Sequence, residues 1–444
     1  MCRTPWKPPE SPSDFDERQW TIPTAMIQTS SIEEKLRSAV GSQNLRPATS
    51  ADAVAGVLPQ FVAEPANERQ LAAVLSLANE AGIAVVPRGG GTKLDWGNRP
   101  KKADVILSTV RLNRILEHAW ADLTVTAEAG CTLQTLQETL AQHGQRLAFD
   151  GLWPERATVG GALSTNDSGV LRLRFGALRD LIIGITLALA DGTLASSGGK
   201  VVKNVAGYDL PKLVTGALGT LGVITRAVFR LHPLPHGVKT FSFTADGFQT
   251  IQDLVLSIQD SKLAHTALQI RCAASDKPKA DILFEATEAG LSAQESQLRK
   301  ILGPISAEQS SEDIWTVRQG LWTSEDDTVN AKISILPAGT AKLLETLERI
   351  AHGKTFHWQI VAQATGIVTL RLEGEPARLS AAVEQLRVEV EGSNGSLAVL
   401  RRPQELESLD AWGSAGDAAG LMRAVKRQLD PKNILNPGRF AGGI

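Results

Sequence analysis

Three consecutive glycines, Gly89 to Gly91, directly follow a short apolar run in the segment VVPRGGGTKLDWG. Glycine permits positive φ angles and lacks the Cβ that keeps a backbone away from a ligand. Successive backbone N–H groups in such a turn can converge on an anion. The segment therefore predicts either a phosphate-binding loop, continuing through Thr92 and Lys93, or a glycine-rich surface turn. On its own it does not separate the two.

Composition bounds the class of protein. With 444 residues, 43% hydrophobic and 21% charged, the chain has the composition of a soluble globular protein of about two or three domains. A net charge of −2 gives no sign of the excess positive charge that is typical of nucleic-acid-binding proteins. No apolar stretch reaches the roughly 18 residues that cross a bilayer, so we expect membrane contact to be at most peripheral, through partners.

The cysteines are few and scattered. Cys2, Cys131 and Cys272 lie far apart in the sequence and form no CxxC pair. This spacing excludes a zinc ribbon or a cysteine-ligated iron–sulfur cluster within the chain. It also fits a reducing compartment, and we expect a cytoplasmic location.

Periodicity divides the first half of the chain. We expect residues 1–48, which are rich in proline, to form a poorly ordered extension. Regular patterning follows: a helix capped by Asn67, a buried strand leading into the glycines, and an alternating, half-buried strand within 121–130. The segment 181–197 reads as a hairpin turning at Asp191-Gly192. This domain is expected to end near residue 236.

The second half has a different rhythm. Short strands alternate with amphipathic helices expected at 248–258, 291–302, 340–351 and 376–389. That order predicts an antiparallel sheet backed on one side by helices over residues 237–414. We expect residues 415–444 to form a helix and a tail that returns to the first domain.

Two common nucleotide-binding motifs are absent. A GxGxxG motif starting at Gly89 would need glycine where Leu94 stands, and Gly199-Lys200 is followed by Val201 rather than the Ser or Thr of a Walker A loop. Two further glycine-rich stretches occur at 154–180 and 216–227. Three such stretches in one domain favour an extended dinucleotide lying along the backbone.

Four motifs then carry a family resemblance. VPRGGGTKLDWG, ATVGGALSTNDSGVLRLRFGALRDLIIGITLALADG, KNVAGYDLPKLVTGALGTLGVIT and LDPKNILNPGRF occur in the order typical of PCMH-type FAD-binding flavoproteins of the vanillyl-alcohol-oxidase superfamily. The resemblance covers roughly 55–235 and 420–444, and within the family it is strongest to the E-type FAD-binding subunits of bacterial glycolate oxidases. It implies an α+β fold: an FAD-binding domain of two α/β subdomains over 49–236, and the C-terminal domain as a substrate-side cap.

The resemblance also implies a set of cofactor-binding residues. Those matching the FAD-contacting stretches of the family are Pro87, Arg88, Gly89, Gly90, Gly91, Thr92, Lys93, Thr158, Gly160, Gly161, Ser164, Asn166, Ser168, Gly169, Gly222, Val223, Ile224 and Asn436. Some branches attach FAD through a histidine in the first loop. This loop has none, so we expect non-covalent FAD.

Two residues of the second domain match substrate-binding positions. Arg318 in DIWTVRQGLW resembles an arginine that binds the substrate carboxylate in related 2-hydroxy-acid dehydrogenases, and Lys332 in NAKISILP resembles a strand lysine facing the flavin. A surface salt bridge on a helix is the alternative for Arg318. The resemblance implies oxidation of glycolate or D-lactate to the 2-oxo acid by hydride transfer to FAD.

One family feature is missing. Catalytic relatives carry a His-Gly-x-Gly-Asn-x-His motif where this chain has VAQATGIVTLRL, and His352 and His357 nearby are interpreted as a helix end and a strand residue. No histidine pair has the spacing of a metal site, so no metal is expected. The alternative function is therefore a non-catalytic, flavin-bearing subunit that stabilises or relays electrons for a catalytic paralogue. In either case an iron–sulfur subunit is the expected electron acceptor; a sugar-directed oxidase or reductase is a third option.

Overall fold

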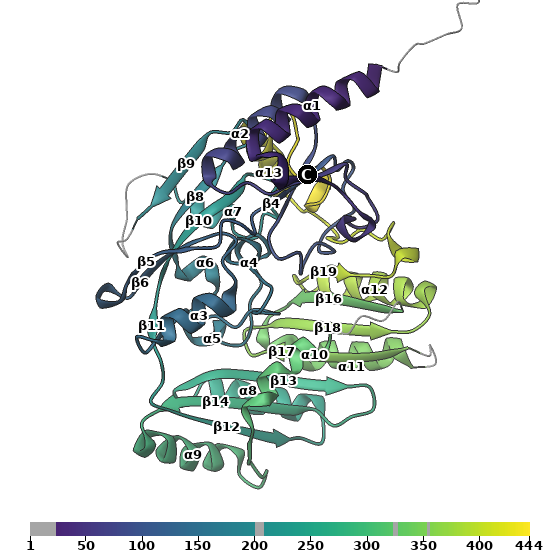
Figure 1. Cartoon of the computed structure of the whole chain (residues 1–444). Coiled ribbons are helices and arrows are strands. Elements are labelled where there is room, and N and C mark those ends of the chain that lie inside the picture. The colour runs from purple at the N-terminus through teal and green to yellow at the C-terminus, as the bar shows by residue number, and fades with distance from the viewer. Residues whose placement is uncertain (1–23, 200–207, 323–326, 353–355) are drawn as a thin grey trace, which may run out of the picture.

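The computed structural model describes residues 24–199, 208–322, 327–352 and 356–444, with side chains from residue 32 onward. Figure 1 shows an upper part built from the first half of the chain and a lower part in which helices back a broad sheet. The C-terminal segment runs back from the lower part to the upper one. The cavity described below lies in the upper part, and a charged cluster beside it lies where the two parts meet.

The first sheet of the upper part contains a βαβ unit. Its strand order is β1-β2-β4-β3, with β2, β4 and β3 parallel. The helix α2 joins β2 to β3; the Asn67 side chain accepts a hydrogen bond from the Gln70 N–H at its start, and Gly82 ends it in the left-handed conformation. The expected helix and strands are thus confirmed. Their bounds are β1 (Leu45–Pro47), β2 (Phe61–Ala63), α2 (Glu68–Ala81), β3 (Val85–Arg88) and β4 (Val105–Ser108).

The expectation of a poorly ordered extension over 1–48 is wrong for its second half. The helix α1 (Thr24–Val40) packs on α2, and β1 pairs with β2. Leu36 and Val40 are fully buried in the same hydrophobic cluster as Leu71 of α2. Burying one apolar stripe of α1 on this sheet outweighs the cost of ordering the segment. Residues 1–23 lie outside the described residues.

A second sheet completes the upper part. Its antiparallel strands run in the order β5-β6-β10-β8-β9, and β8 and β9 form the expected hairpin. All of β6 is buried, so the expected half-buried strand is wrong; β6 lies between β5 and β10, and its Glu128 is covered by Arg114, whose Nη2 lies 2.8 Å from Glu128 Oε1. The strand bounds are β5 (Ile115–Ala119), β6 (Thr124–Glu128), β8 (Ile182–Ala188), β9 (Leu194–Gly198) and β10 (Val223–Arg230).

Short helices and a small ribbon fill the loops of this sheet. The helix α3 begins after Thr132, whose hydroxyl accepts from the Thr135 N–H. The elements are α3 (Leu133–Ala141), α4 (Val159–Thr165), α5 (Arg172–Phe175), α6 (Leu178–Leu181) and α7 (Leu210–Val214), with the ribbon β7 (Gln145–Arg146) and β11 (His232–Pro233).

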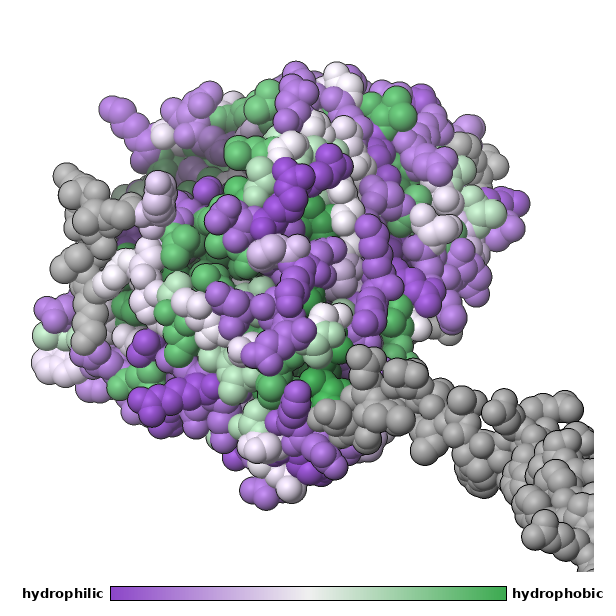
Figure 2. Space-filling model, turned by 90° about the horizontal axis from the view of Figure 1, so that it is seen from above, coloured by the Kyte–Doolittle hydropathy of each residue, from purple (hydrophilic) through white to green (hydrophobic). Residues whose placement is uncertain are grey.

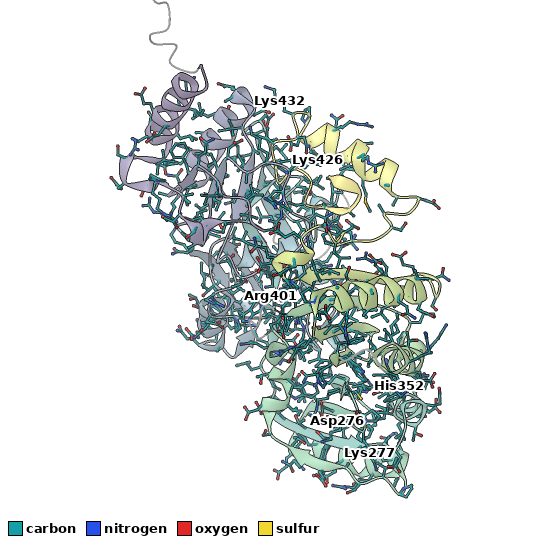
Figure 3. The ribbon with its side chains drawn as sticks, turned by 90° about the vertical axis from the view of Figure 1, so that its right-hand side faces the viewer. Asp276, Lys277, His352, Arg401, Lys426 and Lys432 are labelled. Carbon is teal, nitrogen blue, oxygen red and sulfur yellow. The ribbon has the colours of Figure 1, made fainter. Side chains whose placement is uncertain are left out.

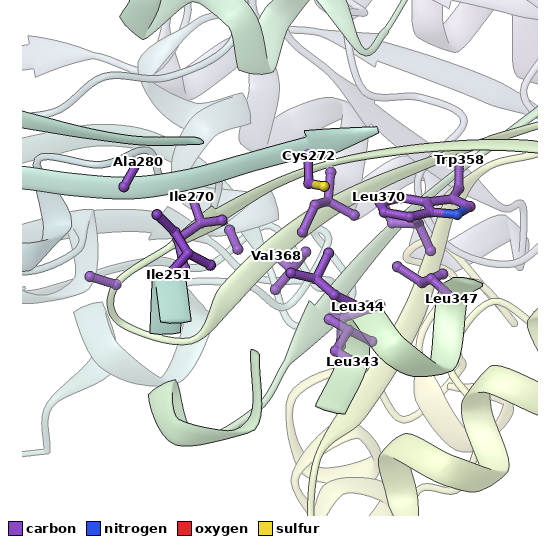
Figure 4. Close-up of a cluster of buried hydrophobic side chains, with 14 of the residues drawn as sticks. Ile251, Ile270, Cys272, Ala280, Leu343, Leu344, Leu347, Trp358, Val368 and Leu370 are labelled. Carbon is purple, nitrogen blue, oxygen red and sulfur yellow. The ribbon is translucent and has the colours of Figure 1, made fainter. Parts of the chain in front are cut away.

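The lower part is the expected antiparallel sheet with helices on one face. Its strand order is β15-β12-β14-β13-β17-β18-β16-β19. Side chains of α8 and α11, such as Ile251 and Leu344, pack against sheet residues such as Ile270 and Leu370 (Figure 4). The strands are β12 (Gly237–Thr244), β13 (His265–Ala273), β14 (Lys279–Ala286), β15 (Glu308–Ser310), β16 (Thr328–Ser334), β17 (His357–Gln363), β18 (Ile367–Glu373) and β19 (Ser396–Arg401); the helices are α8 (Phe248–Gln259), α9 (Glu288–Leu302), α10 (Val317–Gly320), α11 (Thr340–Ala351) and α12 (Pro376–Glu391).

The other face of this sheet packs against the upper part. Arg146 forms a bidentate ion pair with Glu285 of β14, with N–O distances of 2.7 and 2.5 Å. Gln363 of β17 donates a hydrogen bond to the backbone oxygen of Ser168 at 3.1 Å. These contacts fix the cap against the first domain.

The C-terminal segment closes the upper part. After α13 (Ala419–Leu429), the chain runs beside β3, where the Val85 N–H donates to the Ile434 oxygen and the Asn436 N–H to the Val85 oxygen. Lys426 of α13 points into this junction (Figure 3) and donates to Asp430 at 2.6 Å and to the Thr220 and Leu435 backbone oxygens at 2.8 Å. A buried lysine thus ties three segments together.

The surface adds one observation about membranes. Seen from above, hydrophilic side chains cover most of the visible surface, with smaller hydrophobic groups between them (Figure 2). None of the helices in the described ranges is long and apolar enough to cross a bilayer.

Replacing Asp430 should be strongly destabilising. Its carboxylate accepts from Lys426 and from the Ile434 and Leu435 N–H groups, and both charged side chains are buried. Asp430→Ala would leave a buried ammonium without its counterion, so we expect the free energy of unfolding to fall by about 3–5 kcal/mol in urea titration. The exposed Asp417→Ala serves as the control. Equal effects of the two variants would contradict this account of the tail.

Candidate functional site

The three glycine-rich stretches and the C-terminal tail meet around one open cavity. All predicted cofactor-binding residues line it except Asn166, Ser168 and Gly169. The sequence analysis missed Leu94, Trp96, Thr109, Thr165, Leu218, Gly219 and Arg439. All of these except Thr109 stand inside the quoted motifs. Thr109 follows β4 and reaches the cavity because β4 runs parallel to β3, so their carboxyl ends meet at one edge.

The first glycine loop approaches the second closely. A Cβ on Gly90 would lie 1.8 Å from the Arg156 backbone oxygen, and one on Gly89 would lie 2.1 Å from the Thr158 hydroxyl. Within the described residues, the backbone N–H groups of Gly89 to Thr92 have no hydrogen-bond acceptor. Unpaired backbone donors facing a cavity indicate a site for an anionic group. The surface-turn alternative for this segment does not fit that arrangement.

The tail supplies two polar side chains to the cavity. The Asn436 Nδ2 donates to the Leu218 oxygen at 2.5 Å, while its Oδ1 is buried without a partner in the described part of the chain. Arg439 donates to the Leu94 oxygen and, at 2.6 Å, to the Trp96 oxygen. Burial lowers the pKa of Arg439 to about 10, so it remains a cation at neutral pH. The tail therefore holds the first loop in place through the hydrogen bonds from Arg439.

The three predicted residues outside the cavity lie at or near the boundary with the cap. Asn166 ends α4 in the left-handed conformation, and the Ser168 oxygen accepts from Gln363. Gly169 packs on Asp150: a Cβ there would lie 1.9 Å from the Asp150 carboxylate. Burial raises the pKa of Asp150 to about 6, while nearby Arg318 opposes that shift. These positions connect the cavity wall to the cap sheet.

The structure brings the two predicted substrate-binding residues together. Arg318 of α10 donates from Nε to the Thr369 hydroxyl at 3.3 Å. Lys332 of β16 stands directly opposite Thr369 of β18 in the strand register. Arg318 and Lys332 therefore share one neighbour on the sheet face that meets the first domain, and Arg318 is not a surface residue, because its side chain is only 12% exposed.

A buried carboxylate links this pair to the cavity. Asp167, which the sequence analysis did not single out, accepts a hydrogen bond from Arg318 Nη2 and another from the Leu152 N–H at 2.9 Å. Lys93 Nζ, which lines the cavity, lies 3.4 Å from Asp167 Oδ2. Burial by itself would raise the pKa of Asp167, but Arg318 and Lys93 hold it well below its usual value.

The cations of this cluster are also shifted. Burial lowers the pKa of Lys93 and that of Lys332, and Asp167 partly offsets both shifts. Lys93 Nζ lies 5.6 Å from the ring centroids of both Trp96 and Trp153. Trp322 of the cap stacks on Trp96 with ring centroids 5.5 Å apart. Lys93 is thus packed among indole rings, and in such an apolar environment its electrostatic interactions are stronger than in water.

The remaining candidate groups do not form a second site. His352 ends α11 (Figure 3) and His357 begins β17, and both are exposed, which confirms their interpretation as a helix end and a strand residue. The described residues contain no histidine, cysteine and carboxylate group suited to a metal ion. Cys131 and Cys272 are buried free thiols, and burial raises their pKa values to about 11 and 12. Neither is a reactive thiolate at neutral pH.

Comparison with known families agrees with this geometry. The family described as FAD binding domain matches residues 59–198, and the family described as FAD linked oxidases, C-terminal domain, matches residues 414–440. The segment 59–198 contains the glycine loops at Gly89 and Gly160, and the segment 414–440 contains Asn436 and Arg439, all of which line the cavity.

Several curated proteins are similar in sequence. Glycolate oxidase subunit GlcD of Bacillus subtilis is 30% identical over 53% of this chain and 49% of its own length. D-lactate dehydrogenase of Archaeoglobus fulgidus is 37% identical over 43% of this chain and 42% of its own. The match thus spans about half the length of these two relatives. D-2-hydroxyglutarate dehydrogenase of Xanthomonas citri pv. viticola is 26% identical over 86% of this chain and 89% of its own.

Solved structures share the fold at low sequence identity. p-Cresol methylhydroxylase superposes with a TM-score of 0.75 and 16% identity over 93% of this chain and 96% of its own. Alkyldihydroxyacetonephosphate synthase gives a TM-score of 0.71, also at 16% identity, over 92% and 86%. Residues 59–198 are therefore similar to an FAD binding domain and residues 414–440 to the C-terminal domain of FAD linked oxidases, and the chain shares its fold with p-cresol methylhydroxylase.

Proposed function

We propose that the chain oxidises a small 2-hydroxy acid, glycolate or D-lactate, to the corresponding 2-oxo acid by hydride transfer to FAD. The observation that carries this proposal is the position of Arg318 and Lys332 around Thr369, beside Lys93 at the edge of the cofactor cavity. Buried cations in such an arrangement suit a carboxylate. The activities named for the sequence relatives support the same substrate class.

The cavity suits FAD on the evidence of its own atoms. The free N–H groups of Gly89 to Thr92 offer a cradle for a diphosphate, and the orphan Asn436 Oδ1 offers an acceptor. When bound, FAD supplies the acceptor for the hydride that leaves the substrate Cα. The residues lining the cavity include no histidine, cysteine or tyrosine to which a flavin could be attached, so we propose non-covalent binding.

The chain's own residues would bind and orient the substrate. Lys332 has no hydrogen bond or ion pair within the described residues, and Arg318 Nη1 likewise has none there, so both remain available to a carboxylate. Thr369 fixes the Arg318 side chain through Nε. Trp96, Trp153 and Trp322 exclude water from the charged groups. Such preorganised charges need no rearrangement when the anion arrives.

A second candidate function is a flavin-bearing subunit that relays electrons for a catalytic paralogue. Asp167 favours it, because this buried carboxylate already engages Arg318 and Lys93. The described hairpin of β17 and β18 also carries glutamine and threonine where catalytic relatives carry the histidine motif. In both versions we propose that electrons pass to an iron–sulfur subunit in a cytoplasmic complex.

Crowding the first loop should weaken FAD binding. In Gly90→Ala the new methyl group would collide with the Arg156 oxygen, so the loop must shift and its N–H groups lose their alignment. We expect FAD affinity to fall at least about tenfold, equivalent to about 1.4 kcal/mol, in a fluorescence titration of apoprotein. Gly420→Ala, where a Cβ meets nothing, is the matched control. Equal affinities for both variants would argue against a diphosphate on this loop.

FAD should leave the protein on denaturation. Acid precipitation of the yellow holoprotein is expected to release all flavin into the supernatant, because no lining side chain can form the covalent bond. Flavin absorbance in pellet and supernatant measures this directly. Colour that stays with the washed pellet would show that the attachment is covalent.

Removing the free cation should block reduction by substrate. Lys332→Met keeps the length of the side chain but loses its charge, so we expect anaerobic flavin bleaching by glycolate or D-lactate to slow about 10- to 100-fold with FAD content unchanged. The control is Arg349→Ala, an exposed arginine on the outer helix α11.

The same experiment separates the two candidate functions. Bleaching of the isolated wild-type chain supports catalysis by this chain. Bleaching only after a partner subunit is added supports the relay, and unchanged bleaching in Lys332→Met would remove this lysine from the substrate site.

A further inference from the structure

The Asp167 carboxylate is held in the way that a protein holds a bound carboxylate ligand. Its partners come from three separate segments: Arg318 of the cap and the Leu152 N–H donate hydrogen bonds to it, and Lys93 of the first loop forms an ion pair with it at 3.4 Å. The side chain is completely buried. An arginine, a lysine and a backbone N–H converging on one carboxylate would, without Asp167, form an anion site.

This carboxylate lies next to the proposed substrate site and shares its groups. Arg318 gives Nη2 to Asp167 and keeps Nη1 free within the described chain, while Lys332 stands across Thr369 from it. Lys93 contacts Asp167 and also lines the cofactor cavity. The cluster therefore has two sets of groups for a carboxylate: Lys332 and Arg318 Nη1, which have no partner within the described chain, and a second place that Asp167 fills.

We propose that Asp167 fills the place of a second substrate carboxylate and so restricts this site to monocarboxylic 2-hydroxy acids. The inference rests on the proposed function and makes it more specific. A dicarboxylic acid would find the donors of the second place already used, and its second charge would meet the Asp167 charge. In a buried site that repulsion is poorly screened by water or salt.

Two unreactive analogues isolate this selectivity from the chemistry. 2-Hydroxyisobutyrate and citramalate both lack a hydrogen on the hydroxyl-bearing carbon, so neither can donate a hydride, and they differ by one added carboxylate. Titration of the FAD-loaded full chain, followed by the flavin spectrum and by calorimetry, gives both dissociation constants. We expect wild-type protein to bind 2-hydroxyisobutyrate at least about tenfold more tightly than citramalate.

Substitution of Asp167 should change that ratio. Asp167→Ala frees Lys93, Arg318 Nη2 and the Leu152 N–H, so the preference is expected to move at least about tenfold toward citramalate. Asp167→Asn keeps the side-chain shape and an acceptor oxygen, so it should shift the ratio of the two dissociation constants in the same direction by a smaller factor. The asparagine variant provides the test if the alanine variant does not fold. Asp281→Asn is the matched control, since Asp281 is equally buried and paired with Arg271 at 2.7 Å but contacts neither Arg318 nor Lys93.

The outcomes are separable from those of the proposed function. Equal binding of both analogues by wild-type protein, or the same change of ratio in the Asp167 and Asp281 variants, overturns the inference even if glycolate bleaches the flavin. The expected ratios in a protein that no 2-hydroxy acid ever bleaches would support the inference about binding and overturn catalysis by this chain.

Discussion

The cavity depends on a close approach between two stretches of backbone, at Gly90 and Arg156. At Gly90 the first loop passes so near to the Arg156 oxygen that an added Cβ would lie 1.8 Å from it, and within the described residues the N–H groups of Gly89 to Thr92 have no acceptor. The diphosphate site that we propose for this cavity depends on this contact. The parallel strands bring the loop to the sheet edge, and the second glycine stretch forms the facing wall.

Two buried charge networks then fix the parts around that loop. Lys426 and Asp430 anchor the tail, which carries Asn436 and Arg439 into the cavity. On the other side, Asp167 joins Lys93 of the loop to Arg318 of the cap. Buried ion pairs bring little net stability, but breaking one is costly, so they hold the geometry of their neighbours. The ion pair between Asp167 and Arg318 positions the arginine, and it also neutralises part of the positive charge that a substrate carboxylate could use.

Local patterns were sufficient for most of the fold. The helix N-cap at Asn67, the turn at Asp191-Gly192 and the amphipathic helices of the C-terminal domain are each encoded within a few residues. The structure has each of them. The errors came from tertiary contacts. The segment of α1 belongs to an extension expected to be poorly ordered, yet Leu36 is buried in the same cluster as Leu71 of α2. β6 alternates in sequence, but it is buried throughout and its Glu128 is paired with Arg114.

The sequence by itself determined where the glycine-rich loops of the FAD binding domain match lie, because such motifs mark places where a backbone must approach a ligand or another backbone, and that need is local. It also pointed to Arg318 and Lys332. Only the tertiary structure decided what these cations face. Asp167, Thr369 and Lys93 are separated from them by long stretches of chain and carry no motif that names them as partners. A charge pair depends on distance and burial, and these are properties of the folded chain rather than of any segment.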